Sequence, residues 1–180
     1  MPAKKVLIIS SGPRKNGNTD LLCSQFQKGA KEAGHKAEKI FLPNYKINYC
    51  SGCGACRESH TCVQKDDMAK LLDKMVKADV IVLGTPVYFY SMCAQLKTFI
   101  DRCVARYTEI SGKDFYFILA AADTSKKNMT RTIEALRGFT EDCLENTREK
   151  AIIYGVGAWE KGEVKDLPVF EKAYEAGKKC

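Results

Sequence analysis

The stretch Lys5-Val-Leu-Ile-Ile-Ser10, continued by Ser11-Gly-Pro-Arg-Lys-Asn-Gly-Asn-Thr19, decides the fold. Its first part is an unbroken apolar run, which is typical of a strand buried on both faces of a parallel sheet. A loop rich in Gly and Asn follows, and apolar residues then recur at helical spacing from about Thr19 to Ala33. We therefore predict a strand, a tight loop and a helix in succession, which is the start of a βαβ unit.

The same alternation continues through the rest of the chain. Strands are predicted at residues 5–10, 36–42, 79–84, 114–122 and 151–156, and helices at 19–33, 68–76, 91–105, 129–146 and 164–178. This alternation predicts one α/β domain over residues 1–180, with a doubly wound five-stranded parallel sheet of order 2-1-3-4-5 and helices on both faces. Ligands bind such sheets beyond the carboxyl ends of the strands, so we expect the site in the loops after Ser10, Gly84 and Ala122.

The composition argues against several classes of protein. Of the 180 residues, 45% are hydrophobic and 28% are charged, as in an ordinary globular domain. No apolar run approaches the roughly 20 residues that span a bilayer, and no signal-type segment follows the N-terminus, so we expect a cytoplasmic protein without membrane contact. The net charge of +7 comes from scattered basic residues. A nucleic-acid footprint would be denser, so we expect no nucleic-acid partner, although the charge could attract an acidic redox partner.

The loop after the first strand has the features of a phosphate-binding loop. Glycines such as Gly17 let the backbone approach a phosphate, and the first N–H groups of the following helix point at the same place. The side chains that could contact the phosphate are Ser10, Ser11, Arg14, Asn18 and Thr19. The spacing fits neither G-x-G-x-x-G nor G-x-x-x-x-G-K-[ST], which counts against dinucleotide and nucleoside triphosphate sites of those types. The alternative is a turn that only connects the strand to the helix.

A second loop, Gly84-Thr-Pro-Val-Tyr-Phe-Tyr90, lies just past the third predicted strand. Pro86 fixes the turn, and the aromatic residues Tyr88 and Phe89, together with backbone N–H groups, could contact a flat, polar ring system. The same aromatic residues could instead belong to the core or to a subunit interface.

Taken together, these segments resemble the NADPH-dependent FMN reductase family of the flavodoxin-like superfamily. The matching segments are 11–19, 85–88, the run Leu96-Lys-Thr-Phe-Ile-Asp-Arg102, and the cysteines of 50–62 followed by Asp66-Asp67-Met68. The resemblance implies a flavodoxin-like fold, FMN as cofactor, NAD(P)H as co-substrate and a small-molecule electron acceptor such as a quinone or a flavin. It also implies a homodimer or homotetramer. In such a protein the flavin performs the redox chemistry, so no side chain is predicted as a catalytic base.

The resemblance also assigns the residues of the FMN site. It implies that the phosphate lies in the loop 14–19 and that the isoalloxazine lies against 86–89, with 121–125 at its far side. The predicted cofactor-binding residues are Ser10, Ser11, Arg14, Gly17, Asn18, Thr19, Thr85, Pro86, Val87, Tyr88, Phe89, Ala121 and Asp123. One departure is Gly12, where the family usually has serine. One of the two preceding serines could supply the missing hydroxyl.

Four cysteines are spaced as Cys50-x2-Cys53-x2-Cys56-x5-Cys62 within a loop predicted at about 43–65. Thiolates at such intervals can ligate a [4Fe–4S] cluster, and the spacing resembles that of iron–sulfur flavoproteins, a branch of the same family. Three alternatives stay open, namely zinc, a redox-active disulfide and a loop without metal. The other five cysteines are expected to be small apolar residues, and His60 is expected to face solvent.

The sequence therefore supports two redox functions. The first is an FMN-dependent NAD(P)H oxidoreductase, and the second is a relay in which a ferredoxin-like donor passes single electrons through a [4Fe–4S] cluster to FMN. A third hypothesis is a phosphate-binding module that shares only the fold. Two features stay undecided. Lys97, Asp101 and Arg102 could form a subunit interface or surface ion pairs, and Trp159 could cover a site or lie in an interface.

Overall fold

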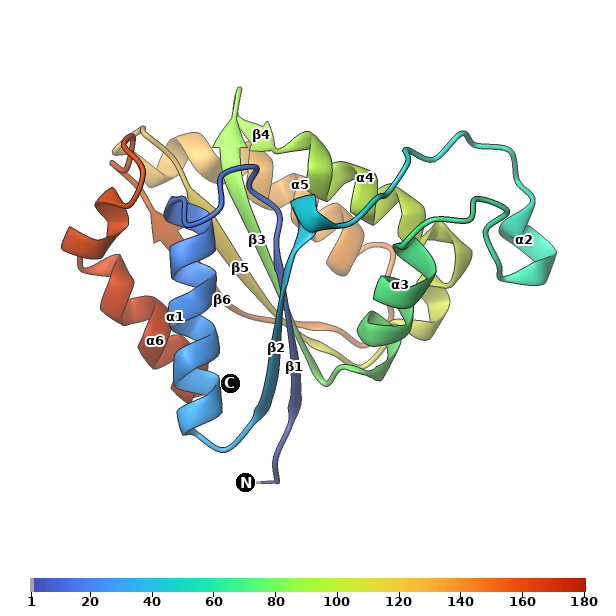
Figure 1. Cartoon of the computed structure of the whole chain (residues 1–180), viewed down its shortest axis with the longest axis horizontal. Coiled ribbons are helices and arrows are strands. Elements are labelled where there is room, and N and C mark those ends of the chain that lie inside the picture. The colour runs from blue at the N-terminus through green and yellow to red at the C-terminus, as the bar shows by residue number, and fades with distance from the viewer. Residues whose placement is uncertain (1) are drawn as a thin grey trace.

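The central sheet of the computed structural model, which describes residues 2–180, has the strand order β2-β1-β3-β5-β6 (Figure 1). All neighbours in this series pair in parallel. The strands are β1 (Lys5–Ser10), β2 (Lys36–Phe41), β3 (Val80–Tyr88), β5 (Asp114–Ala120) and β6 (Arg148–Gly155). In chain order this is 2-1-3-4-5, so the predicted flavodoxin-like sheet is confirmed. The order switches between β1 and β3, and a ligand site is expected beyond the carboxyl ends of these two strands.

A sixth, two-residue strand was not predicted from the sequence. β4 (Ser91–Met92) folds back on the end of β3, which continues past its predicted end at Gly84. The turn between them consists of Phe89 and Tyr90, whose φ angles of 48° and 63° lie in the left-handed region that side-chain-bearing residues rarely adopt. Because this hairpin uses the residues before position 93, the next helix begins at 94 rather than at the predicted 91.

Helices cover both faces of the sheet, as predicted. They are α1 (Asn18–Glu32), α3 (Met68–Lys77), α4 (Ala94–Arg102), α5 (Thr130–Thr140) and α6 (Val169–Lys178), whereas the short α2 (Cys56–Ser59) lies apart from the sheet in the loop between β2 and α3 (Figure 1). α1 and α6 lie on one face, and α3, α4 and α5 lie on the other (Figure 1). The last helix begins at Val169, later than predicted, directly after Pro168, which has no N–H to donate to a preceding helical turn. Within residues 2–180 no helix is long and apolar enough to cross a membrane.

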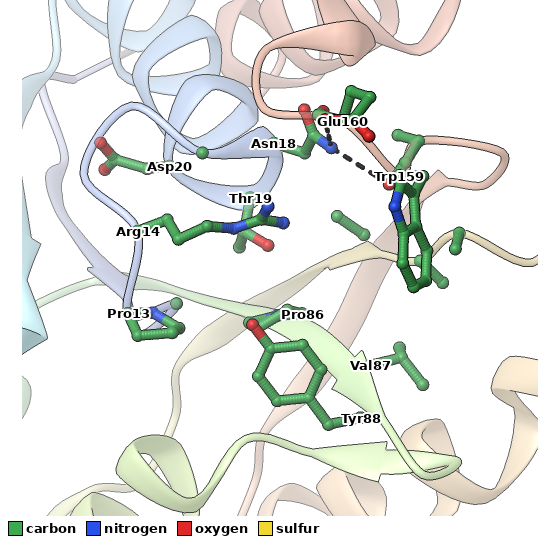
Figure 2. Close-up of a pocket in the computed structure, with 16 residues that line it drawn as sticks. Pro13, Arg14, Asn18, Thr19, Asp20, Pro86, Val87, Tyr88, Trp159 and Glu160 are labelled. Carbon is green, nitrogen blue, oxygen red and sulfur yellow. Dashed lines mark hydrogen bonds between the residues drawn. The ribbon is translucent and has the colours of Figure 1, made fainter.

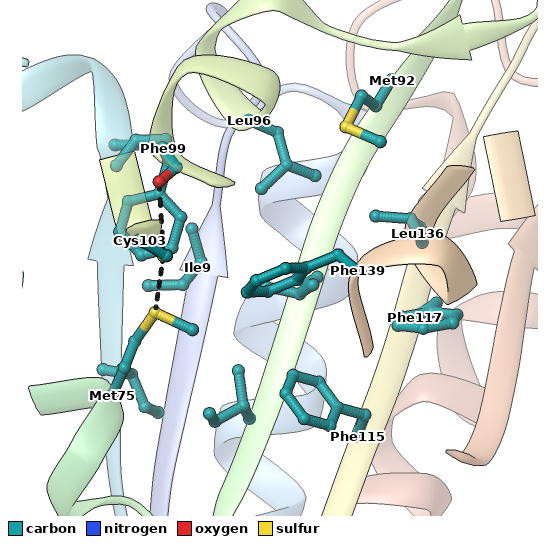
Figure 3. Close-up of a cluster of buried hydrophobic side chains, with 14 of the residues drawn as sticks. Ile9, Met75, Met92, Leu96, Phe99, Cys103, Phe115, Phe117, Leu136 and Phe139 are labelled. Atoms are coloured by element: carbon teal, nitrogen blue, oxygen red, sulfur yellow. Dashed lines mark hydrogen bonds between the residues drawn. The ribbon is translucent and has the colours of Figure 1, made fainter. Parts of the chain in front are cut away.

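Alternating side chains of the strands divide the core into two clusters. In β1, Leu7 and Ile9 belong to the cluster under α3, α4 and α5, whereas Val6 and Ile8 belong to the cluster under α1 and α6. This is the two-residue period of a strand buried on both faces. Figure 3 shows part of the larger cluster, where phenylalanines from β5 and α4 pack with aliphatic and sulfur-containing side chains. Each fully buried side chain of this size contributes about 1.5–3 kcal/mol.

The α1–α6 crossing depends on two glycines. A Cβ atom on Gly29 would lie 2.0 Å from the carbonyl oxygen of Tyr174, and one on Gly177 would lie 2.1 Å from that of Phe26. Since both neighbours are backbone atoms, neither position can hold a side chain without moving a helix. The crossing therefore fixes α1, whose N-terminus points at the carboxyl edge of the sheet.

Candidate functional site

A cavity of about 520 Å³ opens at the carboxyl ends of β1, β3 and β5, beside the N-terminus of α1 (Figure 2). It brings together segments that are far apart in the chain. The predicted site residues that line it are Arg14, Gly17, Asn18, Thr19, Pro86, Val87, Tyr88 and Ala121. It is also lined by Gly12, the residue at which the loop departs from the family, and by Ala122 of the predicted third loop. Five further lining residues were not singled out from the sequence, namely Pro13, Asp20, Ala120, Ala158 and Glu160. Trp159, left undecided by the sequence, lines the cavity as well.

The N-terminus of α1 is suited to an anion. Gly17 precedes the helix without a side chain to cap it, so the N–H groups of the first turn have no intrahelical acceptor. Thr19 lies in this turn and lines the cavity. The guanidinium of Arg14 reaches across the same space (Figure 2), and it forms no ion pair within residues 2–180. Free N–H groups, a positive helix end and an arginine together favour a bound phosphate.

The two serines that precede this loop lie beneath the cavity rather than in it. The Ser10 hydroxyl donates to Asp20 Oδ1 at 2.9 Å, and the Ser11 hydroxyl donates to the Gly84 carbonyl oxygen at 2.6 Å. Both residues are fully buried, so neither hydroxyl replaces a serine at position 12. A Cβ atom on Gly12 would approach Pro86 Cδ to 3.3 Å, so the close packing of the two loops leaves little room there.

Asp20 holds the loop between β1 and α1 in place. Its carboxylate accepts hydrogen bonds from Ser10, from the backbone N–H of Asn16 at 2.9 Å and from Lys39 Nζ at 2.6 Å. Burial acts to raise the pKa of Asp20, but the Lys39 ammonium and these hydrogen bonds outweigh it and keep the pKa below its ordinary value. The paired carboxylate is therefore ionised without leaving a free negative charge beside the anion site.

Asn18 ties a distant loop to the start of α1. Its Nδ2 donates to the carbonyl oxygens of Ala158 and Glu160, at 3.1 and 2.9 Å, and its Oδ1 accepts from the Gly162 N–H at 2.9 Å. The side-chain amide that we expected to contact phosphate is thus engaged with the backbone of this loop. The same hydrogen bonds bring Trp159 to the wall of the cavity (Figure 2).

Three predicted residues of the second and third loops, Thr85, Phe89 and Asp123, do not line the cavity. Thr85 is buried behind the wall, where its hydroxyl accepts the Cys93 N–H at 3.0 Å. Phe89 projects fully into solvent from the β3–β4 hairpin. Asp123 lies outside the cavity and caps its own loop, accepting hydrogen bonds from the Ser125 N–H and from Asn128, which lower its pKa. The structure therefore does not bring these three side chains into the cavity.

The four clustered cysteines surround a second, smaller cavity of about 150 Å³ in the loop between β2 and α3. Cys50 and Cys53 are exposed, Cys56 and Cys62 are partly buried, and all are free thiols. His60 is exposed, as expected, and does not line the cavity. A hydrogen bond from the Ala55 backbone N–H lowers the pKa of the Cys53 thiol.

The donor set of this cavity fits a four-thiolate group. Four cysteine sulfurs are the usual ligands of a [4Fe–4S] cluster, and four-thiolate zinc sites also exist. Among residues 2–180, no three His, Cys, Asp or Glu side chains converge closely enough to hold a metal ion as the loop now lies. The thiols therefore share one cavity, and ligation would require the loop to draw them inward.

The charged residues near the end of α4 do not act as one group. Lys97 and Asp101 form an exposed ion pair at helical spacing, with 2.6 Å between Nζ and Oδ1. Arg102 is neither a surface residue nor part of that pair, because its side chain is buried against Asp66.

Comparison with known proteins points to one family. Residues 4–141 match the NADPH-dependent FMN reductase family. An iron–sulfur flavoprotein of Archaeoglobus fulgidus is 41% identical over 98 residues, which cover 54% of this chain and 44% of that protein. One of Methanocaldococcus jannaschii is 44% identical over 98 residues, covering 54% and 51%. The chain thus spans about half the length of the curated relatives it matches.

Solved structures share the whole fold at low identity. The FMN-dependent NADH-azoreductase of Bacillus anthracis, solved in complex with FMN, has a TM-score of 0.75 at 16% identity, covering 97% of this chain and 98% of that one. The NAD(P)H:quinone oxidoreductase of Methanothermobacter marburgensis has a TM-score of 0.73 at 18% identity, covering 98% and 96%. At these identities the likeness concerns the fold alone.

Proposed function

Because the chain belongs to the NADPH-dependent FMN reductase family, we propose that it is an oxidoreductase that binds FMN in the cavity beside α1. One observation carries this proposal, namely the uncapped first turn of α1 with Arg14 and Thr19 around it. The FMN phosphate would lie at this helix end, and the isoalloxazine would lie along the wall of Pro86, Val87 and Tyr88. Bound FMN supplies the hydride and electron chemistry.

The chain's own residues bind and enclose the cofactor in this proposal. Arg14 neutralises the phosphate, and backbone N–H groups of the first helical turn donate to it. Tyr88 and Trp159 exclude water from the ring system. We propose NAD(P)H as the donor and a small molecule, such as a quinone or a flavin, as the acceptor. Nine free thiols favour the reducing environment of the cytoplasm as the place of action.

A second candidate function is favoured by the cysteine cavity and by the relatives named iron–sulfur flavoproteins. In it, Cys50, Cys53, Cys56 and Cys62 hold a [4Fe–4S] cluster, and a ferredoxin-like donor supplies single electrons that reach FMN. In either function we propose a homodimer or homotetramer, since the fully exposed Phe89 and the largely exposed Trp159 offer apolar surface beside the cavity.

The first experiment is purification without oxygen, followed by an absorbance spectrum with flavin, iron and sulfide assays. Bound FMN supports the oxidoreductase, and failure to take up added FMN contradicts it. Four iron and four sulfide per chain, lost on Cys53→Ser with FMN retained, would support the relay. A Cys143→Ser variant is the matched control, because Cys143 is exposed and lies outside the cysteine cavity. Rapid NAD(P)H oxidation by iron-free, FMN-loaded protein would instead support the first function.

A further inference from the structure

Arg102, the last residue of α4, is a buried arginine that lines the cysteine cavity. Only 1% of its side-chain surface is exposed. Its guanidinium makes a two-pronged ion pair with Asp66, with Nη1–Oδ2 and Nη2–Oδ1 distances of 2.6 and 3.0 Å. Nη2 also lies 3.4 Å from Cys62 Sγ. Cys62, one of the four predicted cluster ligands, is therefore in contact with a buried positive charge.

The ion pair closes the base of the cysteine loop. Arg102 donates to the Asn48 carbonyl oxygen at 2.7 Å, and Asp66 accepts the N–H groups of Asn48 and Met68 at 3.0 and 3.1 Å. The residues that enter and leave the loop are thus bound to the same two side chains. Burial acts to raise the pKa of Asp66, but the guanidinium and the two N–H groups keep it below its ordinary value, so the pair is ionised.

The guanidinium has one donor left over. Arg102 Nε is buried and has no hydrogen-bond partner within the described chain. An unpaired charged donor costs more than a neutral one, so such groups are rare unless something else accepts from them or benefits from the charge. The cavity that Arg102 lines is bounded by four thiols, which ligate metal only as negatively charged thiolates.

We propose that Arg102 is a positioning residue that sets the electrostatic potential of the four-cysteine cavity and favours a negatively charged iron–sulfur group there, with Asp66 opposing it. This inference rests on the second candidate function. A cluster held by four thiolates gains a further negative charge on reduction, and cluster potentials depend on nearby charge and on hydrogen bonds to the sulfurs. Arg102 supplies both at Cys62, so it raises the midpoint potential, whereas the Asp66 carboxylate lowers it.

Two substitutions with opposite predicted signs test this role. Arg102→Gln removes the positive charge and should lower the reduced-to-oxidised ratio of the cluster at a fixed potential about tenfold, which is about 59 mV for one electron. Asp66→Asn removes the negative charge and should shift the potential upward. Arg102→Lys keeps the charge without the planar fork and should restore most of the wild-type value. A residue that only anchors the loop would not produce shifts of opposite sign.

The measurement is a redox titration of anaerobically purified holoprotein, followed by electron paramagnetic resonance, with iron counted per chain. Arg106→Gln is the matched control, because Arg106 pairs with Glu109 at 2.7 Å on the surface and does not line the cavity. We expect this control to leave the potential unchanged.

The possible results separate the two proposals. Opposite shifts in Arg102→Gln and Asp66→Asn, with the control unmoved, support the inference. Shifts of the same sign, or no shift while iron is retained, overturn it and leave the relay standing. If Arg102→Gln fails to fold or loses iron, an upward shift in Asp66→Asn with a near-wild-type potential in Arg102→Lys supports the inference, and a downward or absent shift in Asp66→Asn overturns it. Absence of iron from the unsubstituted protein removes both the relay and the inference.

Discussion

The loop between β1 and α1 and the cysteine loop between β2 and α3 leave the same edge of the sheet, and each is tied down by one buried aspartate. Asp20 pairs with Lys39 of β2, and Asp66 pairs with Arg102 of α4. In both cases burial acts to raise the pKa of the carboxyl, and its partners outweigh that effect. The two loops nevertheless differ in what they present to solvent.

The first loop buries its two serines and presents to the cavity the backbone at the start of α1 together with Arg14 and Thr19. Ser10 and Ser11 are hydrogen-bonded beneath the cavity, and the open N–H groups of α1 remain for a ligand. The cysteine loop is fixed only at its base and presents thiols, two of them exposed. The first loop therefore offers backbone N–H groups to a ligand, whereas the second offers cysteine sulfurs around a cavity.

The largest expected effect concerns the packing that fixes the first loop. Gly177→Ala places a Cβ atom against the Phe26 carbonyl oxygen, so we expect the free energy of unfolding to fall by about 3 kcal/mol. Urea denaturation measures it. Gly138→Ala in α5 is the control, because its Cβ would meet only Asp142 Oδ2 at 3.9 Å, and it should not destabilise. Equal effects at the two positions would show that the α1–α6 crossing does not determine stability.

The next effect concerns the ligand of the first loop. Arg14→Gln removes the positive charge that reaches over the end of α1, so the dissociation constant of FMN should rise about tenfold or more, as for loss of a charged hydrogen bond. FMN fluorescence titration of apoprotein measures it, and the iron content should not change. Lys15→Gln removes an equal charge from a neighbour that does not line the cavity. If both substitutions weaken FMN binding equally, only the general charge of the loop matters.

The smallest effect is the pH dependence that each aspartate contributes. Because the pKa of Asp66 in the folded protein lies below its ordinary value of 3.8, its ionised form stabilises the fold above about pH 4, and this stabilisation is lost as the pH falls through the folded-state pKa. Asp66→Asn should therefore reduce the unfolding free energy near neutral pH and flatten its decline in acid. Urea denaturation from about pH 6 down to about pH 3 tests this. An unchanged slope would mean that Asp66 does not contribute.

Local pattern was sufficient to predict the sheet and its order from the sequence. Apolar runs such as 5–10 and 79–84 identified the strands, and the Gly- and Asn-rich segment after Ser10 identified one loop of the cavity. The β3–β4 hairpin was missed because its turn residues, Phe89 and Tyr90, are not the glycine or asparagine that usually adopt positive φ.

The parts of the site that were missed depend on contacts between distant residues. Asn18 binds Ala158, which is 140 positions away, and this contact brings Trp159 to the cavity. Arg102 and Asp66 are 36 positions apart, and helical spacing alone could not show that the arginine turns inward. Asn18 was predicted to contact phosphate in the loop after β1, but only the fold shows that its side-chain amide is hydrogen-bonded to the loop after β6.

Trp159 gives the protein a built-in optical reporter. It is the only tryptophan of the chain, and it stands at the wall of the larger cavity, 72% exposed. Indole emission overlaps the region where oxidised flavin absorbs, so the tryptophan fluorescence of unlabelled protein should decrease as flavin enters that cavity. Because the smaller cavity is not lined by this residue, cofactor uptake in one pocket can be followed while the thiols of the other are titrated, alkylated or left alone.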